Sequence, residues 1–232
     1  MQKVLLLIVV VMSFGGTFKN VHRHRDSSEF AVESNIPQQQ TRYVKGQTLS
    51  STGTPAVRLT FNKDFKYVGS QDFILYDVAR AEQYFFVDAD KQGRIRRMYW
   101  VQFEGYLSSN TNTYRYKVNK TINIGGFDFI ADAYARNVKA NPGRPDSDGS
   151  RARDFLEKQG YRMMSDEVMS QRLVHLVDES KRNELMIIYL EDLSAMKLTA
   201  ADLAPGGSAA ARWEEVSMGL LERARKGMEV SR

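Results

Sequence analysis

Apolar and polar residues alternate along short stretches of the first half of the chain, which is the pattern of half-buried strands. Val57–Phe61 alternates at every position, whereas Phe73–Val78 is apolar at nearly every position. Tyr84–Val87 and Ile95–Phe103 are rich in aromatic residues and are separated by a turn that contains Asp and Gly. These two stretches therefore predict an antiparallel hairpin. Tyr114–Val118 alternates again and predicts one more strand.

The period of the apolar residues then changes to that of a helix. Between residues 127 and 138, Phe127, Ile130, Ala131, Tyr134 and Val138 recur at helical spacing. This pattern predicts a helix that ends before the Asn-Pro-Gly sequence at 141–143. A second, shorter helix is expected to start at Ser150 as its cap, to run through Lys158 and to end at Gly160.

The strand period returns in Leu173–Val177 and Leu185–Leu190, which the polar segment 178–183 connects, so we predict a second hairpin. Ser208 can cap a final helix that runs through about Lys226. The apolar residues of that helix fall on one face: Trp213, Val216, Leu220, Leu221 and Ala224. This order of elements lacks regular β-α-β alternation. It predicts an α+β fold, in which an antiparallel sheet built from hairpins packs with two or three helices, including an amphipathic C-terminal one.

The first fifteen residues have the pattern of an export signal. Lys3 precedes the apolar run Val4–Met12, and the small residues Ser13 and Gly15 have the spacing that a signal peptidase requires. The run is too short to cross a bilayer, which takes about 20 residues. We therefore predict a signal peptide over 1–15 and a periplasmic or secreted protein. The alternative is a buried strand at the start of the fold.

Residues 16–54 contain Gln, Ser, Thr and scattered charges that interrupt any apolar period. This composition predicts a flexible leader or linker. The 232 residues suffice for one domain or two small ones, and we predict a single α+β domain over 55–232.

Composition limits the function classes. The absence of cysteine excludes disulfides, thiol catalysis and lipid attachment at a cysteine. A net charge of +5 favours anionic neighbours, and Arg94, Arg96, Arg97, Arg115 and Lys117 would form a basic stripe. Such a stripe could contact an anionic envelope component, although charges on strands more often prevent edge-to-edge pairing. No nucleic-acid motif and no stable transmembrane anchor is predicted, and the sequence leaves the oligomeric state open.

One motif suggests a metal site. Asp88–Ile95 resembles the first eight positions of an EF-hand calcium loop, with oxygen side chains at positions one, three and five and Gly93 at position six. Tyr99 stands at position twelve, where a Glu should complete the shell, and the flanking residues predict strands. We therefore interpret the segment as a hairpin turn, and we predict no metal site and no cofactor.

The strand after this turn carries the candidate binding residues. Trp100, Gln102, Glu104 and Tyr106 share one face. Aromatic walls with a few polar groups are typical of small-molecule pockets, so this face predicts a ligand-binding site. The same mixture also occurs on solvent-facing sheets, because Tyr and Trp favour strands in general. The sequence does not decide whether Trp100 lines a pocket, packs in the core or faces solvent.

Enzyme signatures are few. There is no G-x-S-x-G, HExxH, P-loop or Rossmann pattern, and His175 lies alone in an apolar strand. No catalytic residue is therefore assigned. We interpret the chain as an exported, non-enzymatic protein that binds a small ligand or an envelope partner. The alternative is a hydrolase that uses a pair of carboxylates drawn from Glu104, Asp128 or Glu191.

Overall fold

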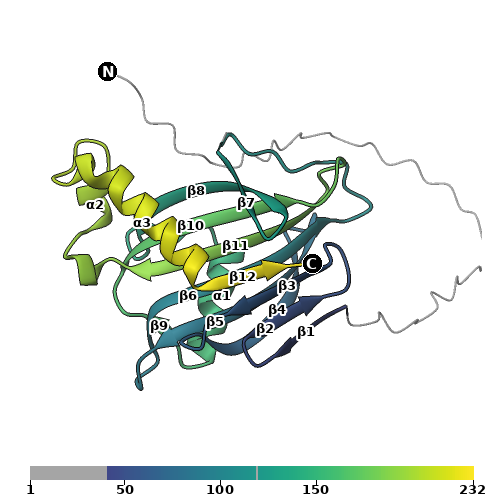
Figure 1. The fold of residues 1–232 in the computed structure, drawn as a ribbon, viewed down its shortest axis with the longest axis horizontal. Helices are drawn as coiled ribbons and strands as arrows, with labels where there is room; N and C mark the ends of the chain where they lie inside the picture. Colours follow the sequence, from purple (N-terminus) through teal and green to yellow (C-terminus); the bar gives the residue numbers. More distant parts are fainter. Residues whose placement is uncertain (1–40, 119) are drawn as a thin grey trace, which may run out of the picture. The chain divides into compact units, whose positions relative to one another are not determined.

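The computed structural model describes residues 41–118 and 120–232, and the described strands form two antiparallel sheets (Figure 1). The larger, eight-stranded sheet has the order β4-β5-β6-β11-β10-β8-β7, with the short β9 added in parallel to β6. Its strands are β4 (Lys66–Leu75), β5 (Ala79–Ala89), β6 (Arg94–Tyr106), β7 (Thr121–Ile124), β8 (Phe127–Asn137), β9 (Arg162–Met163), β10 (Glu167–Leu176) and β11 (Asn183–Asp192).

The smaller sheet has four strands in the order β1-β2-β3-β12. These are β1 (Arg42–Lys45), β2 (Thr48–Ser51), β3 (Val57–Phe61) and β12 (Met228–Ser231). The helices are α1 (Asp148–Lys158), α2 (Ala200–Leu203) and α3 (Trp213–Lys226). The fold is therefore α+β with antiparallel sheets as its main component, as the order of elements predicted.

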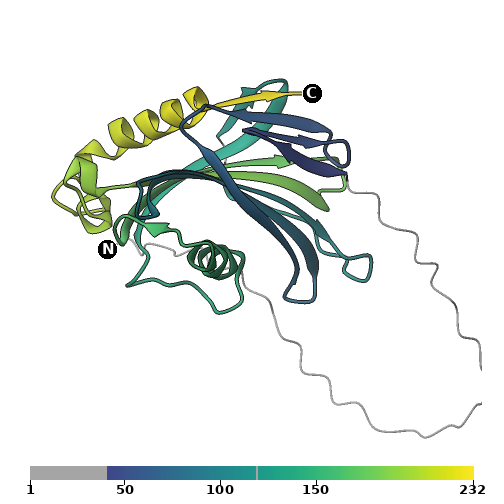
Figure 2. The same ribbon diagram turned by 90° about the horizontal axis from the view of Figure 1, so that it is seen from below.

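The helices α1 and α3 cover opposite faces of the larger sheet (Figure 2). Side chains alternate along β6, so Tyr99 and Val101 face α3 and the smaller sheet, whereas Trp100 faces α1. Each face has its own apolar cluster. On the α1 side, Ala152 and Leu156 of the helix pack against the sheet.

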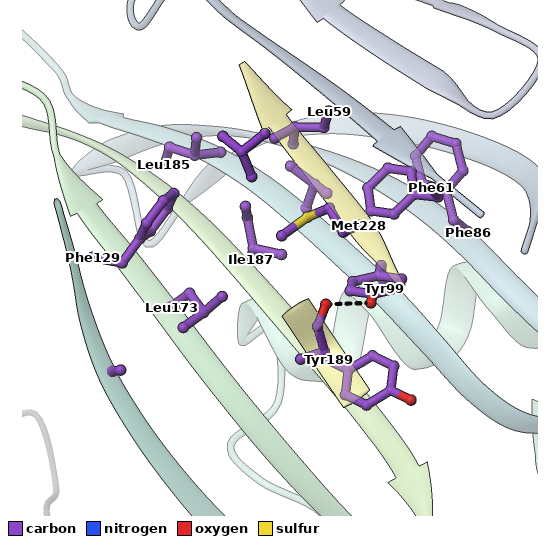
Figure 3. Packing of buried hydrophobic residues seen from close by; sticks show 14 of the residues in the cluster. Leu59, Phe61, Phe86, Tyr99, Phe129, Leu173, Leu185, Ile187, Tyr189 and Met228 are labelled. Carbon is purple, nitrogen blue, oxygen red and sulfur yellow. Dashed lines mark hydrogen bonds between the residues drawn. The ribbon is translucent and has the colours of Figure 1, made fainter. Parts of the chain in front are cut away.

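The core on the α3 side is rich in aromatic residues (Figure 3). Phe61 from the smaller sheet lies 4.1 Å from Phe86 and 4.8 Å from Tyr99, measured between ring centroids. The buried hydroxyl of Tyr99 donates a 2.7 Å hydrogen bond to the carbonyl of Ala224, in the last turn of α3. This bond satisfies a polar group inside the core and ties α3 to the centre of the sheet.

Both predicted hairpins are present. β5 pairs with β6 and β10 pairs with β11, each antiparallel over most of its length. The strand predicted at 73–78 ends earlier, because Tyr76 and Asp77 have positive φ values of 49° and 58°. Two consecutive residues in this conformation form the tight turn between β4 and β5.

The predicted helix at 127–138 is wrong, because this segment is the strand β8. Phe127, Phe129 and Ala131 are buried at every second position and face α3, and β7 and β10 pair with the two edges of β8. The residues chosen for the helical pattern combine both faces of this strand. The alternation of Phe127, Phe129 and Ala131 was the correct signal.

The strand predicted at Tyr114–Val118 is also absent, since this segment is irregular. Its alternation has another cause. The hydroxyl groups of Tyr114 and Tyr116 both reach carboxylates on the α1 side of the larger sheet, whereas Arg115 and Lys117 are exposed. The alternation in the sequence therefore reflects the inward-facing side chains of the two tyrosines. It does not reflect a strand with backbone hydrogen bonds to a neighbour.

The described part of the chain begins at residue 41, so it includes part of the range 16–54 that was predicted as a leader. β1 and β2 lie in that range and pair with each other and with β3. The predicted signal peptide, 1–15, and the remainder of the predicted leader up to residue 40 lie outside the described residues.

Helix α1 begins three residues earlier than expected. Ser147, rather than Ser150, is the N-cap, and its hydroxyl accepts a 3.2 Å hydrogen bond from the Ser150 amide. Gly160 ends the helix with a φ of 81°, as predicted. Phe155 stacks on Phe85 of β5, and Gly69 makes room for it, because a Cβ at Gly69 would lie 2.8 Å from the ring.

Helix α3 starts at Trp213 and not after Ser208, whose hydroxyl donates instead to Asp202. The predicted apolar face is confirmed, with Val216, Leu220 and Ala224 buried. Within residues 41–118 and 120–232, no helix combines the length and the apolar composition needed to cross a membrane.

Candidate functional site

A row of amide side chains crosses three strands on the α1 side of the larger sheet and ends at Glu104. The Nε2 of Gln71 donates to Gln83, and the Nε2 of Gln83 donates to Gln102, both at 2.7 Å. The Nε2 of Gln102 then donates a 2.6 Å hydrogen bond to Glu104. Gln83 and Gln102 are fully buried, so this row satisfies their polar groups without solvent. The row fixes the position of the Glu104 carboxyl.

A second carboxyl, that of Glu184, lies beside Glu104. The two residues are direct partners in the β6–β11 ladder, so their side chains project from the same face of neighbouring strands. Glu184 is buried, and its carboxyl group accepts a 2.6 Å hydrogen bond from the hydroxyl of Tyr116. Glu104 accepts in the same way from Tyr114, at 2.8 Å. The two tyrosines therefore cover the two carboxyls.

Burial changes the acidity of this group. Desolvation, followed by the nearby charge of Glu104, raises the pKa of Glu184 to about 8. Burial also raises the pKa of Glu104, although the hydrogen bonds from Tyr114 and Gln102 oppose the increase. Near neutral pH, Glu184 is thus largely protonated in the folded protein.

Asp148, the first residue of α1, is the third acidic residue of the cluster. Burial raises the pKa of Asp148, and its charge contributes to raising the pKa values of Glu104 and Glu184. The backbone carbonyl of Asp148 accepts a 3.1 Å hydrogen bond from Gln83, so the start of α1 is attached to the amide row. We call Glu104, Glu184 and Asp148 the acidic cluster.

Two arginines lie near the acidic cluster and differ in their partners. Arg172 donates to both carboxylate oxygens of Asp132, at 2.9 and 2.7 Å, and its guanidinium lies 5.2 Å from the ring centroid of Tyr116. Arg136 has no hydrogen bond or ion pair within the described part of the chain, and its Nε is buried without a partner. Arg136 is thus a cation on the sheet that lacks a bound carboxylate.

A cavity of about 340 Å³ lies between α1 and the larger sheet, and Trp100, Arg136 and Asp148 line it. The loop before α1 and the strand β9 also contribute to its walls. The apolar part of the lining includes Met98, Val138, Ala152, Leu156, Met163, Val168 and Leu190. The volume falls in the range of small-molecule sites, and the lining combines apolar walls with a few polar groups.

Trp100 has two roles in this arrangement. Its side chain is only 6 % exposed and packs in the apolar cluster under α1 with Phe85. It also lines the cavity, and its Nε1 is buried without a hydrogen-bond partner among the described residues. Trp100 is therefore both a core residue and a cavity wall, which combines two of the three possibilities that the sequence left open.

The four candidate residues occupy one region, but they do not all line the cavity. Gln102 and Glu104 belong to the amide row next to it, and Tyr106 stacks on Tyr114 with a centroid distance of 4.5 Å. None of these three is among the described residues that line the cavity. Sequence reasoning missed Arg136, Asp148 and Glu184. Glu184 had a detectable signal, an acidic residue next to the strongly apolar run Leu185–Leu190.

The carboxylates proposed from sequence as a catalytic pair are not together. Asp128 is exposed, and Glu191 lies on the α3 side of the sheet, where Arg223 donates to both of its oxygens. The pair that the structure forms is Glu104 with Glu184. His175 hydrogen-bonds the carbonyl of Asp128 at 3.0 Å and packs edge-on against Phe127.

The turn at Asp88–Gly93 uses its carboxylates for local hydrogen bonds. Asp90 accepts from the amides of Gln92 and Arg94, at 2.9 and 3.0 Å, and from the Arg94 side chain at 2.6 Å. Both oxygens of Asp88 accept from arginines of the predicted basic stripe, Arg96 and Arg97. These arginines lie on β6, an interior strand, so they do not protect a sheet edge.

We expect calcium to find no high-affinity site at Asp88 and Asp90, because arginines and backbone amides already engage both carboxylates and Tyr99 replaces the closing ligand. Titration calorimetry should detect no micromolar binding. The Asp90→Ala variant should instead melt at a lower temperature, since it loses the hydrogen bonds of the turn. A micromolar calcium site that disappears in Asp90→Ala would contradict this interpretation.

Comparison of the chain with models of protein families, with curated proteins and with solved structures finds no significant match.

Proposed function

We propose that the protein binds a small molecule in the cavity between α1 and the larger sheet and that it does so in the periplasm or outside the cell. The observation that carries this proposal is the position of Trp100, a residue that lines the cavity and whose buried Nε1 has no partner among the described residues. A buried donor without an acceptor is costly in a folded protein, and a ligand or water that accepts its hydrogen bond removes this cost. Export remains a prediction from residues 1–15.

The surroundings of the cavity support binding. Its floor is the larger sheet and its cover is α1, whose Phe155 stacks on Phe85 at 5.1 Å and holds the helix in place. Sites built between rigid elements bind ligands with little reorganisation. The apolar lining provides affinity, and Trp100 and Arg136 provide orientation.

A second candidate function is hydrolysis by two carboxylates, and the observation that favours it is the Glu104–Glu184 pair. A carboxyl with a pKa of about 8 can serve as a general acid near neutral pH. Both carboxyls, however, are covered by Tyr114 and Tyr116 and stand apart from the described lining of the cavity. Binding is therefore the better-supported function. Hydrolysis of a bound ester that Glu184→Gln abolishes would favour the second.

Fluorescence of Trp100 tests the binding function directly. The chain has two tryptophans, so in full-length protein with Trp213→Phe all tryptophan emission comes from Trp100. We expect an amphiphile such as octanoate to change this emission in a saturable way. The Ala152→Leu variant should abolish the change, because Ala152 is buried in the cavity lining and the larger side chain fills the space.

The matched control is Ala204→Leu, an exposed position after α2, which should bind like the parent. The proposal fails if no compound of an amphiphile and metabolite screen changes Trp100 emission. It also fails if Ala152→Leu binds as tightly as Ala204→Leu.

A further inference from the structure

Two residues that line the cavity each carry a buried polar atom without a partner, and the two atoms are of one chemical kind. Both the Nε1 of Trp100 and the Nε of Arg136 are buried N–H donors, and neither has an acceptor within the described part of the chain. Their residues lie on different strands, β6 and β8, and line the same cavity. Two donors without acceptors predict a ligand group that accepts hydrogen bonds, because that group would remove the cost of leaving both unpaired.

The charge of Arg136 indicates which kind of hydrogen-bond acceptor the ligand carries. The other arginine on this face, Arg172, is neutralised by a bidentate pair with Asp132, whereas Arg136 has no such partner among the described residues. An unpaired guanidinium that is partly buried favours an anion over a neutral acceptor. A cationic ligand group would instead be repelled.

The acidic side chains of the lining do not cancel this preference. Glu157 and Asp166 are exposed and lie together with the exposed Arg162, so solvent screens their charges. Asp148 also lines the cavity, and burial raises its pKa and disfavours its charged form, although the nearby charge of Arg136 opposes the increase.

The rest of the lining is suited to an apolar body. Met98 and Leu190 come from the sheet, and Ala152 and Leu156 come from α1. All four are buried and belong to the apolar cluster that also contains Trp100. The cavity thus places an apolar surface next to a pair of donors with one positive charge.

We propose that the ligand is an amphiphile with an anionic head, a carboxylate or a phosphate monoester, which Trp100 and Arg136 hold while its apolar body lies between α1 and the sheet. This inference rests on the proposed binding function and specifies its ligand class. It predicts that, among amphiphiles of equal chain length, the binding affinity depends on the charge of the head group.

Four probes of equal chain length test the inference by titration calorimetry on the full-length protein: octanoate, octyl phosphate, 1-octanol and octylammonium. The two anions should bind about tenfold or more tightly than 1-octanol, because a hydrogen bond to a charged group contributes at least that factor. Octylammonium should bind most weakly. Whichever anion binds more tightly identifies the head as a carboxylate or a phosphate.

Substitutions of Arg136 and Trp100 then test whether these two residues cause the preference for anionic probes. Arg136→Gln should reduce octanoate affinity to that of 1-octanol and leave 1-octanol affinity unchanged, and Arg136→Lys should restore part of the difference. Trp100→Phe should cause a smaller loss for the anions, because it removes only the Nε1 donor. Arg58→Gln is the matched control, since it removes the same charge from an exposed position on the smaller sheet.

The inference is overturned if 1-octanol binds as tightly as octanoate to the parent, or if Arg136→Gln and Arg58→Gln have the same affinity for octanoate. Either result leaves the binding function intact. Failure of all four probes to bind, together with no response of Trp100 emission to any screened compound, would instead overturn the binding function itself.

Discussion

Replacement of Trp100 by alanine should lower the free energy of unfolding by about 3–5 kcal/mol, the range observed when a large buried aromatic side chain is truncated. Trp100 is 6 % exposed and packs near Phe85, with ring centroids 6.4 Å apart, in the cluster that attaches α1 to the sheet. The truncation would join new empty space to the existing cavity, and this empty space adds to the cost of the lost burial. Chemical denaturation of the full-length protein measures the loss.

Trp213→Ala is the control for this prediction, because Trp213 is only partly buried at the start of α3. It should cost clearly less than Trp100→Ala. Trp100→Phe should retain most of the stability, since the phenyl ring keeps much of the packing. If Trp100→Ala unfolds at the same denaturant concentration as the parent, the side chain is not the core residue that the structure shows. The alanine variant is therefore a test of packing, and Trp100→Phe is the appropriate test of binding.

The hairpins could be predicted because their signals are local. Aromatic strands on both sides of Asp88–Gly93 fix the β5–β6 pair, and the polar segment 178–183 fixes β10–β11. The segment 127–138 was predicted as a helix because its apolar residues also fit a helical period. The turn signal directly before it was overlooked. Gly125 and Gly126, with φ values of 60° and 82°, form the two-residue turn that makes β7 and β8 a hairpin.

The site could be predicted only in part, for a related reason. Period-2 alternation placed Trp100, Gln102 and Glu104 on one face, and the structure confirms that Gln102 and Glu104 meet. The cavity itself depends on how α1 is placed over the sheet. Arg136 and Asp148 lie outside β6 in the sequence, and they line the same cavity as Trp100 only because of the strand order and the position of Phe155 against Gly69. Single-sequence patterns carry no information about such distant contacts.

Sequence reasoning missed Glu184, the partner of Glu104, because only the register between β6 and β11 brings the two residues together. β11 is far from β6 in the sequence, and its pairing brings Glu184 directly opposite Glu104. Two acidic side chains at adjacent positions would repel each other if both were ionised. Burial and this proximity act in the same direction, and together they keep a proton on the pair at neutral pH.

This proton predicts a pH dependence of stability. In the unfolded chain Glu184 has its ordinary pKa of 4.5, whereas in the folded protein its pKa is about 8. Below pH 4.5 both states hold the proton, so Glu184 has no effect. Between about pH 4.5 and 8 only the folded state holds it, and the free energy of unfolding falls by up to about 1.4 kcal/mol per pH unit. Above pH 8 both states have lost the proton and the loss is complete.

The Glu184→Gln variant should therefore lose a large part of this slope and become more stable than the parent above about pH 8. The glutamine carbonyl can still accept the hydrogen bond from Tyr116, so the geometry is preserved while the titration is removed. A residual slope is expected, because burial also raises the pKa values of Glu104 and Asp148. Denaturation across this pH range measures the difference between the two proteins.

Glu179→Gln is the matched control, because Glu179 is exposed in the connection between β10 and β11, and its removal should leave the parent slope unchanged. The decisive quantity is the number of protons released on unfolding between about pH 4.5 and 8, which should fall by up to one in Glu184→Gln. If the parent, Glu179→Gln and Glu184→Gln release the same number, Glu184 is already ionised in the folded protein. The acidic cluster would then carry the charge of Glu184 at neutral pH, and this charge would disfavour an anionic ligand near Asp148, which links the measurement to the ligand class.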